Sequence, residues 1–238
     1  MSQTIDEAEH SGEMQLPYIH RLLQLAYPNQ PESSYPPLIP IMIGSTNPAT
    51  EAAIGKMLAP YIADSGNAFV ISSDFCHWGS RFGYTYYLPD APSPALDPEV
   101  LPHGVGKDPS SKADTTLHLL PTLSQGINLR STKQLQAPGP EIYESIAHAD
   151  RACMCAIATG EHAQFLQALQ DTGNTICGRH PIGVFMAGLE EVERLAKEQG
   201  SEPEGERRRF RFTRYERSSD VESVRDSSVS YVSAFAVL

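Results

Sequence analysis

Two short apolar runs separated by an amphipathic stretch constrain the fold of this chain most. Residues 38–44 and 67–72 are almost wholly apolar and have the length of a strand, which is typical of strands buried on both faces of a parallel sheet. Residues 48–64 between them have the periodicity of a helix. Strand, helix and strand in this order predict a βαβ unit with a right-handed crossover. Pro40 places the first run near a strand start or a sheet edge.

Further periodic stretches predict the rest of a single α/β domain. Apolar residues recur every three or four positions in four more stretches, which we interpret as helices: 13–26, 140–158, 161–169 and 181–198. In the second of these, Cys153 lies on the face expected to pack in the core. Residues 207–215 and 226–237 have strand-like patterns. We therefore expect one domain over residues 1–238, with a central mixed or mostly parallel sheet flanked by helices.

Residues 88–140 differ in composition from the rest of the chain. Nine of the 19 prolines fall in this segment, together with many Ser, Asp and Gly residues. Such a composition lacks the apolar periodicity that a packed core needs. We predict that the segment is a largely disordered insertion, in which His103 and His118 are solvated rather than bound to a ligand.

The net charge of −11 and the four cysteines narrow the class of protein. An acidic chain is not expected to bind nucleic acid or anionic membranes. No run approaches the ~20 apolar residues of a membrane span, and the acidic first residues do not resemble a signal peptide. Four cysteines in a chain of this size do not predict a disulfide scaffold. We expect a reducing compartment, the cytoplasm, with the nucleus as a second location.

Residues 174–183, Asn-Thr-Ile-Cys-Gly-Arg-His-Pro-Ile-Gly, join a thiol, a guanidinium and an imidazole to the start of a helix. Pro181 suits the first helical turn, because its missing N–H would have no partner there. Cys177 and His180 should therefore lie at a helix N-terminus, where free N–H groups favour negative charge and suit a metal-binding or nucleophilic thiolate. In the alternative interpretation, Cys177 is a small buried hydrophobic residue and His180 caps the helix.

Asp74 and His77 follow the second apolar run directly. In open α/β sheets, ligands bind beyond the carboxyl ends of the strands. A carboxylate three residues from an imidazole can orient it for acid/base chemistry. The alternative is that Asp74 caps a turn and that His77 packs beside Trp78 with both ring nitrogens satisfied.

Four stretches together resemble the Memo family, which is named for a mediator of receptor-driven cell motility. They are residues 10–18, residues 72–79 with Arg81 and Phe82, residues 174–183 and residues 226–231. The resemblance implies a single α/β domain similar to the class III extradiol dioxygenases, which are non-haem iron enzymes. It also implies binding of iron or copper. Residues 88–140 are then an insertion into a short family loop.

The resemblance further implies metal ligands that this chain does not contain. The family's first portion carries a Pro-His-Ala-Gly-Tyr string and a Gly-Pro-Ser-His-His string, each of which donates a metal-binding histidine. Neither string occurs here, so only Cys177 remains of that set, while Asp74, His77 and His180 match other polar positions of the family cleft. We therefore expect an N-terminally truncated domain with an incomplete metal site. One of the two apolar runs should then present an unpaired sheet edge.

Three functions follow from these residues. The leading hypothesis is a non-catalytic Memo-like protein that acts in signalling or binds an unidentified protein partner through a vestigial cleft. The alternative is an iron- or copper-dependent oxidoreductase, with Cys177 and His77 near the metal and His180 as acid or base. A thiol hydrolase using Cys177 and His180 is a third. Because two metal-binding histidines are absent, we expect no enzyme activity; Asp74, His77 and His180 are the catalytic candidates.

Overall fold

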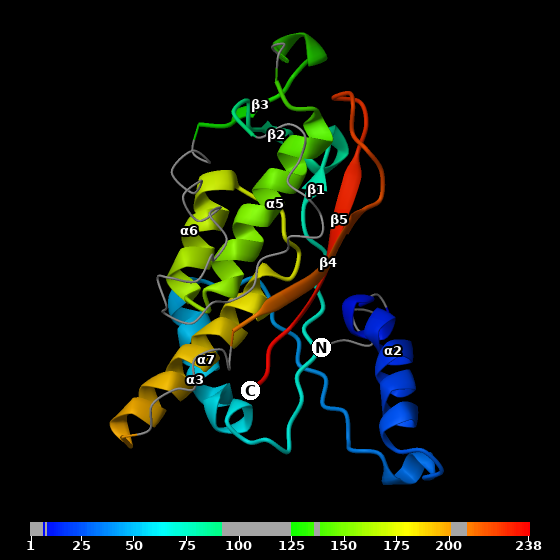
Figure 1. Cartoon of the computed structure of the whole chain (residues 1–238), viewed down its shortest axis with the longest axis vertical. Helices are drawn as coiled ribbons and strands as arrows, with labels where there is room; N and C mark the ends of the chain where they lie inside the picture. Colours follow the sequence, from blue (N-terminus) through cyan, green and yellow to red (C-terminus); the bar gives the residue numbers. More distant parts are fainter. Residues whose placement is uncertain (1–6, 8, 92–124, 136–138, 201–208) are drawn as a thin grey trace.

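The helices that the periodicity predicts are all present. The computed structural model describes residue 7 and residues 9–91, 125–135, 139–200 and 209–238. Its helices are α2 (Ser11–Ala26), α3 (Pro48–Ile62), α5 (Ile142–Ala158), α6 (His162–Thr172) and α7 (Arg179–Glu198), with 3-10 turns at Glu32–Ser34, Ser80–Phe82 and Thr132–Gln134. Its strands are β1 (His77–Trp78), β2 (Tyr86–Tyr87), β3 (Ile127–Asn128), β4 (Arg211–Arg217) and β5 (Ser228–Phe235). The mixed α/β class is therefore confirmed (Figure 1).

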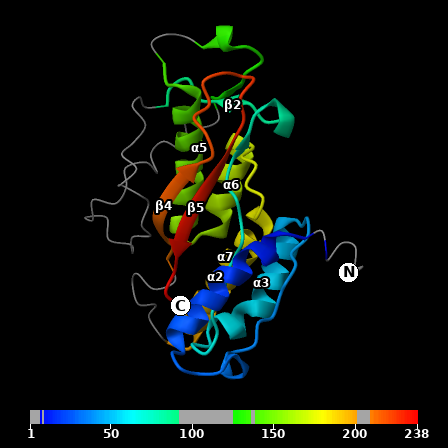
Figure 2. The same cartoon turned by 90° about the vertical axis from the view of Figure 1, so that its right-hand side faces the viewer.

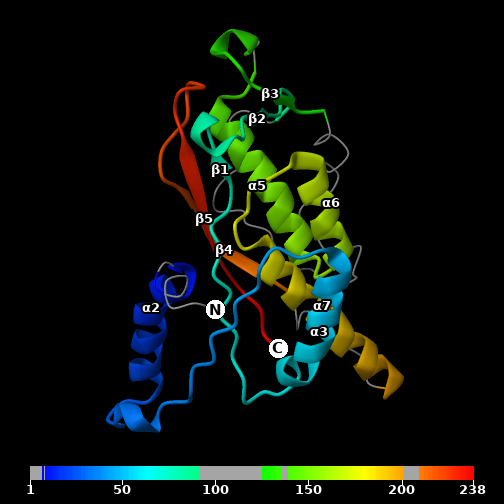
Figure 3. The same ribbon diagram turned by 180° about the vertical axis from the view of Figure 1, so that it is seen from behind.

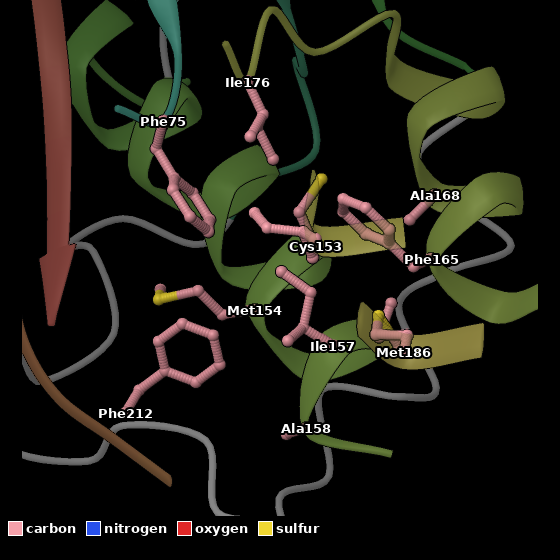
Figure 4. Close-up of a cluster of buried hydrophobic side chains, with 12 residues drawn as sticks. Phe75, Cys153, Met154, Ile157, Ala158, Phe165, Ala168, Ile176, Met186 and Phe212 are labelled. Atoms are coloured by element: carbon pink, nitrogen blue, oxygen red, sulfur yellow. The ribbon is translucent and has the colours of Figure 1, made fainter. Parts of the chain in front are cut away.

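Helix α5 is the centre of the core. Almost every residue of this helix is buried, which is typical of a helix that is covered on all sides. Cys153 faces the core, as expected, among side chains from several elements; Figure 4 shows Phe165 beside it and Phe212 beside Met154 in the same cluster. This packing joins α5, α6, α7 and β4 in one core cluster.

The predicted parallel sheet is wrong, because every strand pair in the described residues is antiparallel. One sheet has the order β1-β5-β4 and a second, two-stranded sheet pairs β2 with β3. Strands β4 and β5 lie side by side (Figure 2), and only residues 218–227 separate them in the chain, which favours an antiparallel pair. Parallel strands would need a long crossover.

Residues 38–44 and 67–72 are not strands, so the expected βαβ unit does not form. Both segments run as extended chain without a ladder. Figure 3 shows residues 38–44 as the blue trace that leads into α3 and residues 67–72 as the cyan trace that leaves it. Their apolar composition predicts burial or pairing, but a strand exists only where a second backbone lies beside it. Within the described residues, these segments have no such neighbour.

Helix α3 packs closely on α7 through a face of small residues. The buried positions of α3 are Glu51, Gly55, Ala59 and Ile62, whereas the large apolar side chains of Met57 and Tyr61 are exposed. A Cβ at Gly55 would lie 2.7 Å from the backbone nitrogen of Gly188 in α7. The two helices therefore touch backbone to backbone.

The ends of segment 88–140 are packed against the core. Leu88, Ala91 and Leu129 are buried, and β3 pairs with β2 across the base of the segment. The rest of the predicted insertion, residues 92–124 and 136–138 with His103 and His118, lies outside the described residues. No helix in the described part of the chain combines the length and apolar character required to cross a membrane.

Candidate functional site

The motif 174–183 is anchored at its start by a buried polar network. Asn174 donates from its side-chain nitrogen to Asp150 Oδ1 of α5 at 2.8 Å. The hydroxyl of Tyr215 on β4 donates to Asp150 Oδ2 at 2.9 Å and lies 3.1 Å from the hydroxyl of Ser230 on β5. Asp150 is fully buried, so these hydrogen bonds replace its lost hydration. The network joins the motif to a helix and to both long strands.

Thr175, the second residue of the motif, holds β1 in place. The backbone N–H of His77 donates to Thr175 Oγ1 at 2.7 Å, and this hydroxyl donates to the carbonyl of His77 at 3.0 Å. His77 Nδ1 lies 3.1 Å from the carbonyl of Phe75, so this nitrogen carries the proton and donates it. Nε2 then lies 3.7 Å from Asp74 Oδ2, which is beyond hydrogen-bond distance. Asp74 therefore lies near His77 without orienting its ring.

Cys177 is exposed, whereas Cys76, Cys153 and Cys155 are buried, and all four are free thiols. The backbone N–H of Asp74 donates to Cys177 Sγ at 3.0 Å. The N–H of Gly178 donates to Ser73 Oγ at 2.9 Å, and a Cβ at Gly178 would lie 2.4 Å from that of Ser73. The turn thus presses against residues 73–74 and presents the sulfur to solvent. The alternative of a buried Cys177 is wrong.

His180 does not cap α7; it faces a buried carboxylate of α3. The ring nitrogen His180 Nδ1 lies 2.7 Å from Glu51 Oε1, and His162 Nε2 of α6 lies 2.7 Å from Glu51 Oε2. Thr46 Oγ1 donates to Glu51 Oε1 at 3.1 Å. A Cβ at Gly183 would lie 2.5 Å from Glu51 Oε2. One carboxylate thus joins α3, α6 and α7, and only a glycine at position 183 leaves room for it.

The environment of Glu51 keeps its carboxylate ionised. Burial raises the pKa of Glu51, but hydrogen bonds from His180, His162 and Thr46 outweigh the burial and leave the pKa below its ordinary value of 4.5. This is the expected result when donors satisfy both oxygens of a buried carboxylate. His180 Nε2 is buried and has no partner among the described residues. The His180 ring therefore makes its contacts through Nδ1, with Glu51 Oε1 at 2.7 Å and Thr46 Oγ1 at 3.1 Å.

The structure brings some of the expected site residues together and separates others. Asp74, His77 and Cys177 lie on one surface where residues 73–77 meet the 174–183 motif. His180 is directed to Glu51 instead. Among the described residues, no group of three or more His, Cys, Asp or Glu side chains is arranged to hold a metal ion. These residues therefore do not fit iron or copper, which need several convergent ligands.

The sequence patterns missed the Glu51 cluster, although two signals were present. Glu51 lies four residues before Gly55 and eight before Ala59, so it shares their helix face. A carboxylate on a face of small residues that packs against another helix requires a buried partner. The second signal is His162, the first residue of α6, which is buried. Its pairing with Glu51, 111 residues away, is set by tertiary packing.

The Asp150 network predicts a stability that decreases as the pH rises. Burial raises the pKa of Asp150 to about 6 from its ordinary value of 3.8, although hydrogen bonds from Asn174 and Tyr215 oppose the shift. The folded state holds this proton more tightly than the unfolded state. The stabilisation is therefore complete below about pH 4 and lost as the pH passes about 6, at a cost of about 3 kcal/mol.

Urea unfolding across this pH range measures the effect. The Asp150→Asn variant should lose most of this downward slope, because its side chain does not ionise. Asp64→Asn is the matched control, since Asp64 is exposed and its amide replacement still accepts from the N–H of Gly66. An unchanged slope in Asp150→Asn would contradict the assignment of the raised pKa.

The chain is similar to proteins of one family along its whole length. A family model described as Memo-like protein matches residues 1–235. The "MEMO1 family protein C4H3.04c" of Schizosaccharomyces pombe is 39% identical over 236 residues, which cover 99% of this chain and 62% of the relative. Protein MEMO1 of Homo sapiens is 33% identical over 97% of this chain and 57% of the relative. Protein MEMO1 of Danio rerio is 32% identical over 100% and 59%.

These matches confirm the family and leave two finer expectations unsupported. The family model begins at residue 1 of this chain, so it does not support the expected N-terminal truncation. The chain nevertheless spans only 57% to 62% of the length of these relatives. The matched family model and relatives are described as Memo or MEMO1 proteins, and none of these descriptions names an extradiol dioxygenase. The fold described above, with its antiparallel sheets, does not confirm that likeness either.

Proposed function

Because the chain belongs to the Memo family, we propose that it acts by binding a protein partner and catalyses no reaction of its own. The binding surface is the cleft surface, which we define as Asp74, His77 and Cys177. The same proposal includes a signalling role in the cytoplasm, with the nucleus as a second location. The charge of −11 argues against nucleic acid as the partner.

The geometry around Cys177 is the observation that carries this proposal. Its sulfur accepts a backbone N–H and lies 3.9 Å from the Ser73 hydroxyl, while the imidazole of His180 is held by Glu51. A thiol nucleophile needs a base within hydrogen-bond reach, and none is placed there in the described residues. A polar surface without this pairing suits recognition. An iron or copper oxidoreductase is not favoured, because the donor side chains do not converge.

The exposed thiol allows a direct test. Benzophenone-maleimide should label Cys177 selectively, because the other three cysteines are buried. Irradiation in an extract of the source cells should give one discrete crosslinked adduct. A Cys177→Ser, Ile127→Cys variant places the same label on an exposed residue of β3, outside the cleft surface, and should give no such adduct. A diffuse pattern that is identical at both positions would contradict partner binding at the cleft surface.

Metal uptake tests the competing function. The protein is incubated with Fe(II) or Cu(II), desalted and analysed for metal. We expect a content well below one ion per chain that Cys177→Ser does not change. Stoichiometric iron or copper that is lost in Cys177→Ser would overturn the non-catalytic proposal.

A further inference from the structure

Two extended segments outside the cleft surface expose apolar side chains to solvent. In residues 38–42, Leu38, Ile39, Ile41 and Met42 are all exposed, Ile39 by 75%. In residues 68–73, the side chain of Val70 is 56% exposed, while Phe69 and Ile71 turn inward against the core. Isolated exposed apolar residues are normal on a protein surface. A contiguous set on extended chain indicates a surface that is covered in function.

The backbone of both segments is also unpaired. In the described structure, no backbone-to-backbone hydrogen bond involves residues 38–45 or residues 68–73. The adjoining chain differs: Phe75 N–H donates to the carbonyl of Ser230 at 2.8 Å, and Ser230 N–H donates to that of Cys76 at 2.9 Å. The pairing with β5 therefore stops at Phe75. Residues 68–73 continue in extended form beyond the point where their partner strand leaves them.

An apolar cavity opens where the two strands part. Its volume is about 410 Å³, which is enough for one or two large side chains. The walls come from residues 65–75, from α7 and from the C-terminal strands, and include Phe69, Ile71, Phe185, Phe210, Val232 and Leu238. Side chains that alternate along a bound strand could enter such a cavity, which is how strand-binding sites select their ligands.

Helix α2 borders the same region and buries nothing. None of its residues is buried, and Leu22 and Leu25 are among the exposed large hydrophobic residues. Figures 1 and 3 show α2 set apart from α3 and α7, with the two extended traces between them. The side-chain amide of Gln15 donates to Ser72 Oγ at 3.2 Å and ties α2 to residues 68–73.

The charge of this part of the chain restricts what can cover it. Among the described residues up to 64, five acidic residues lie outside the core, against two basic ones, while Glu51 is buried. The acidic residues are Glu7, Glu9, Glu13, Glu32 and Asp64, and the basic ones are Arg21 and Lys56. A second copy of this chain would bring the same acidic surface against itself, which costs electrostatic free energy. A partner with basic residues beside its apolar ones is attracted instead. A small apolar ligand would fill the cavity but leave the backbone groups of residues 38–45 unpaired.

We propose that residues 38–44 and 68–73 form an acceptor site for an extended polypeptide segment of a partner protein, with apolar side chains and basic flanking residues. The proposal builds on the proposed partner binding and adds a second surface with a defined chemistry. The guest segment would pair with the free backbone edges and place one apolar side chain in the cavity. Free edges and apolar side chains are together what strand addition uses.

The test measures binding of a fluorescent peptide of alternating Ile and Thr with Lys at both ends to the full chain. We expect saturable binding that Glu at both ends weakens. Methylation of alternate amides along one edge of the peptide should weaken binding about tenfold, because it removes backbone donors. In the protein, Ile39→Lys and Val70→Pro should weaken binding by a similar factor. Ile127→Lys, at an exposed apolar residue of β3 far from the site, should not change it.

Each possible result decides the proposal. Equal binding of the methylated peptide would show an apolar patch without strand pairing and would overturn the proposal. Sedimentation that shows a dimer dissociated by Ile39→Lys and by the peptide would identify a second copy as the occupant and would also overturn it. Absence of peptide binding would overturn it while leaving the crosslink at Cys177 unaffected. Circular dichroism of each variant confirms that the loss is not unfolding.

Discussion

Gly55→Ala is expected to destabilise the protein by about 3 kcal/mol, because α3 and α7 meet there without room for a methyl group. The added Cβ would lie 2.7 Å from the backbone nitrogen of Gly188 and 2.9 Å from the backbone carbonyl carbon of Ala187. Backbone atoms do not rotate away as side chains do, so the two helices must separate. Chemical denaturation of the variant and the parent protein measures the difference.

Two other glycines provide controls for Gly55→Ala. At Gly188, a Cβ would meet the flexible end of Ile62 at 2.5 Å, so Gly188→Ala should cost less. At Gly12, in α2, nothing lies within 4 Å of the added Cβ, and alanine favours the helix, so Gly12→Ala should be neutral or slightly stabilising. A Gly55→Ala protein as stable as Gly12→Ala would show that the close helix contact is not present.

Glu51→Gln should destabilise the protein by about 2 kcal/mol, because the carboxylate accepts hydrogen bonds from two imidazoles and one hydroxyl. Glutamine retains only one acceptor oxygen. Its NH₂ group would face the ring nitrogen of His162 or His180, which donated to the carboxylate, so that one hydrogen bond is lost. Helices α3, α6 and α7 lose their shared contact, so the 174–183 motif should loosen. Hydrogen exchange at the first turn of α7 should increase together with the loss of stability.

The pH dependence of this effect has a defined sign. The pKa of Glu51 in the folded protein lies below its ordinary value of 4.5. The stabilisation by Glu51 is therefore present above that value and is lost as the pH falls through the lowered pKa. Glu51→Gln should remove this acid-side loss. The control Glu198→Gln replaces an exposed carboxylate at the end of α7 and should preserve it. Identical acid denaturation of Glu51→Gln and the parent would contradict the role of Glu51.

The helices could be predicted from the sequence because their determinants are local. Apolar residues at three- and four-residue spacing predict α5 and α7, and Gly200, with a φ of +74°, is the kind of residue that follows a helix end. The position of Cys177 and His180 at a helix start is also local, since Gly178 precedes the first helical residue Arg179. The family resemblance used the same short strings and is confirmed.

The pairing of strands could not be predicted in the same way. Residues 38–44 and 67–72 have the composition of buried strands, yet neither has a neighbouring strand in the described structure. Strand pairing depends on which distant backbone lies alongside, and composition contains no information about it.

In the 174–183 motif, the sequence determines some properties of the site and the tertiary structure determines others. The sequence by itself determined that a thiol and an imidazole lie at the start of a helix, because turn and helix preferences act over a few residues. Only the tertiary structure decided that Cys177 faces solvent beside Asp74 while His180 faces Glu51. Side chains three residues apart in one turn point to different neighbours. Which neighbours they meet is set by the packing of α3, α6 and α7.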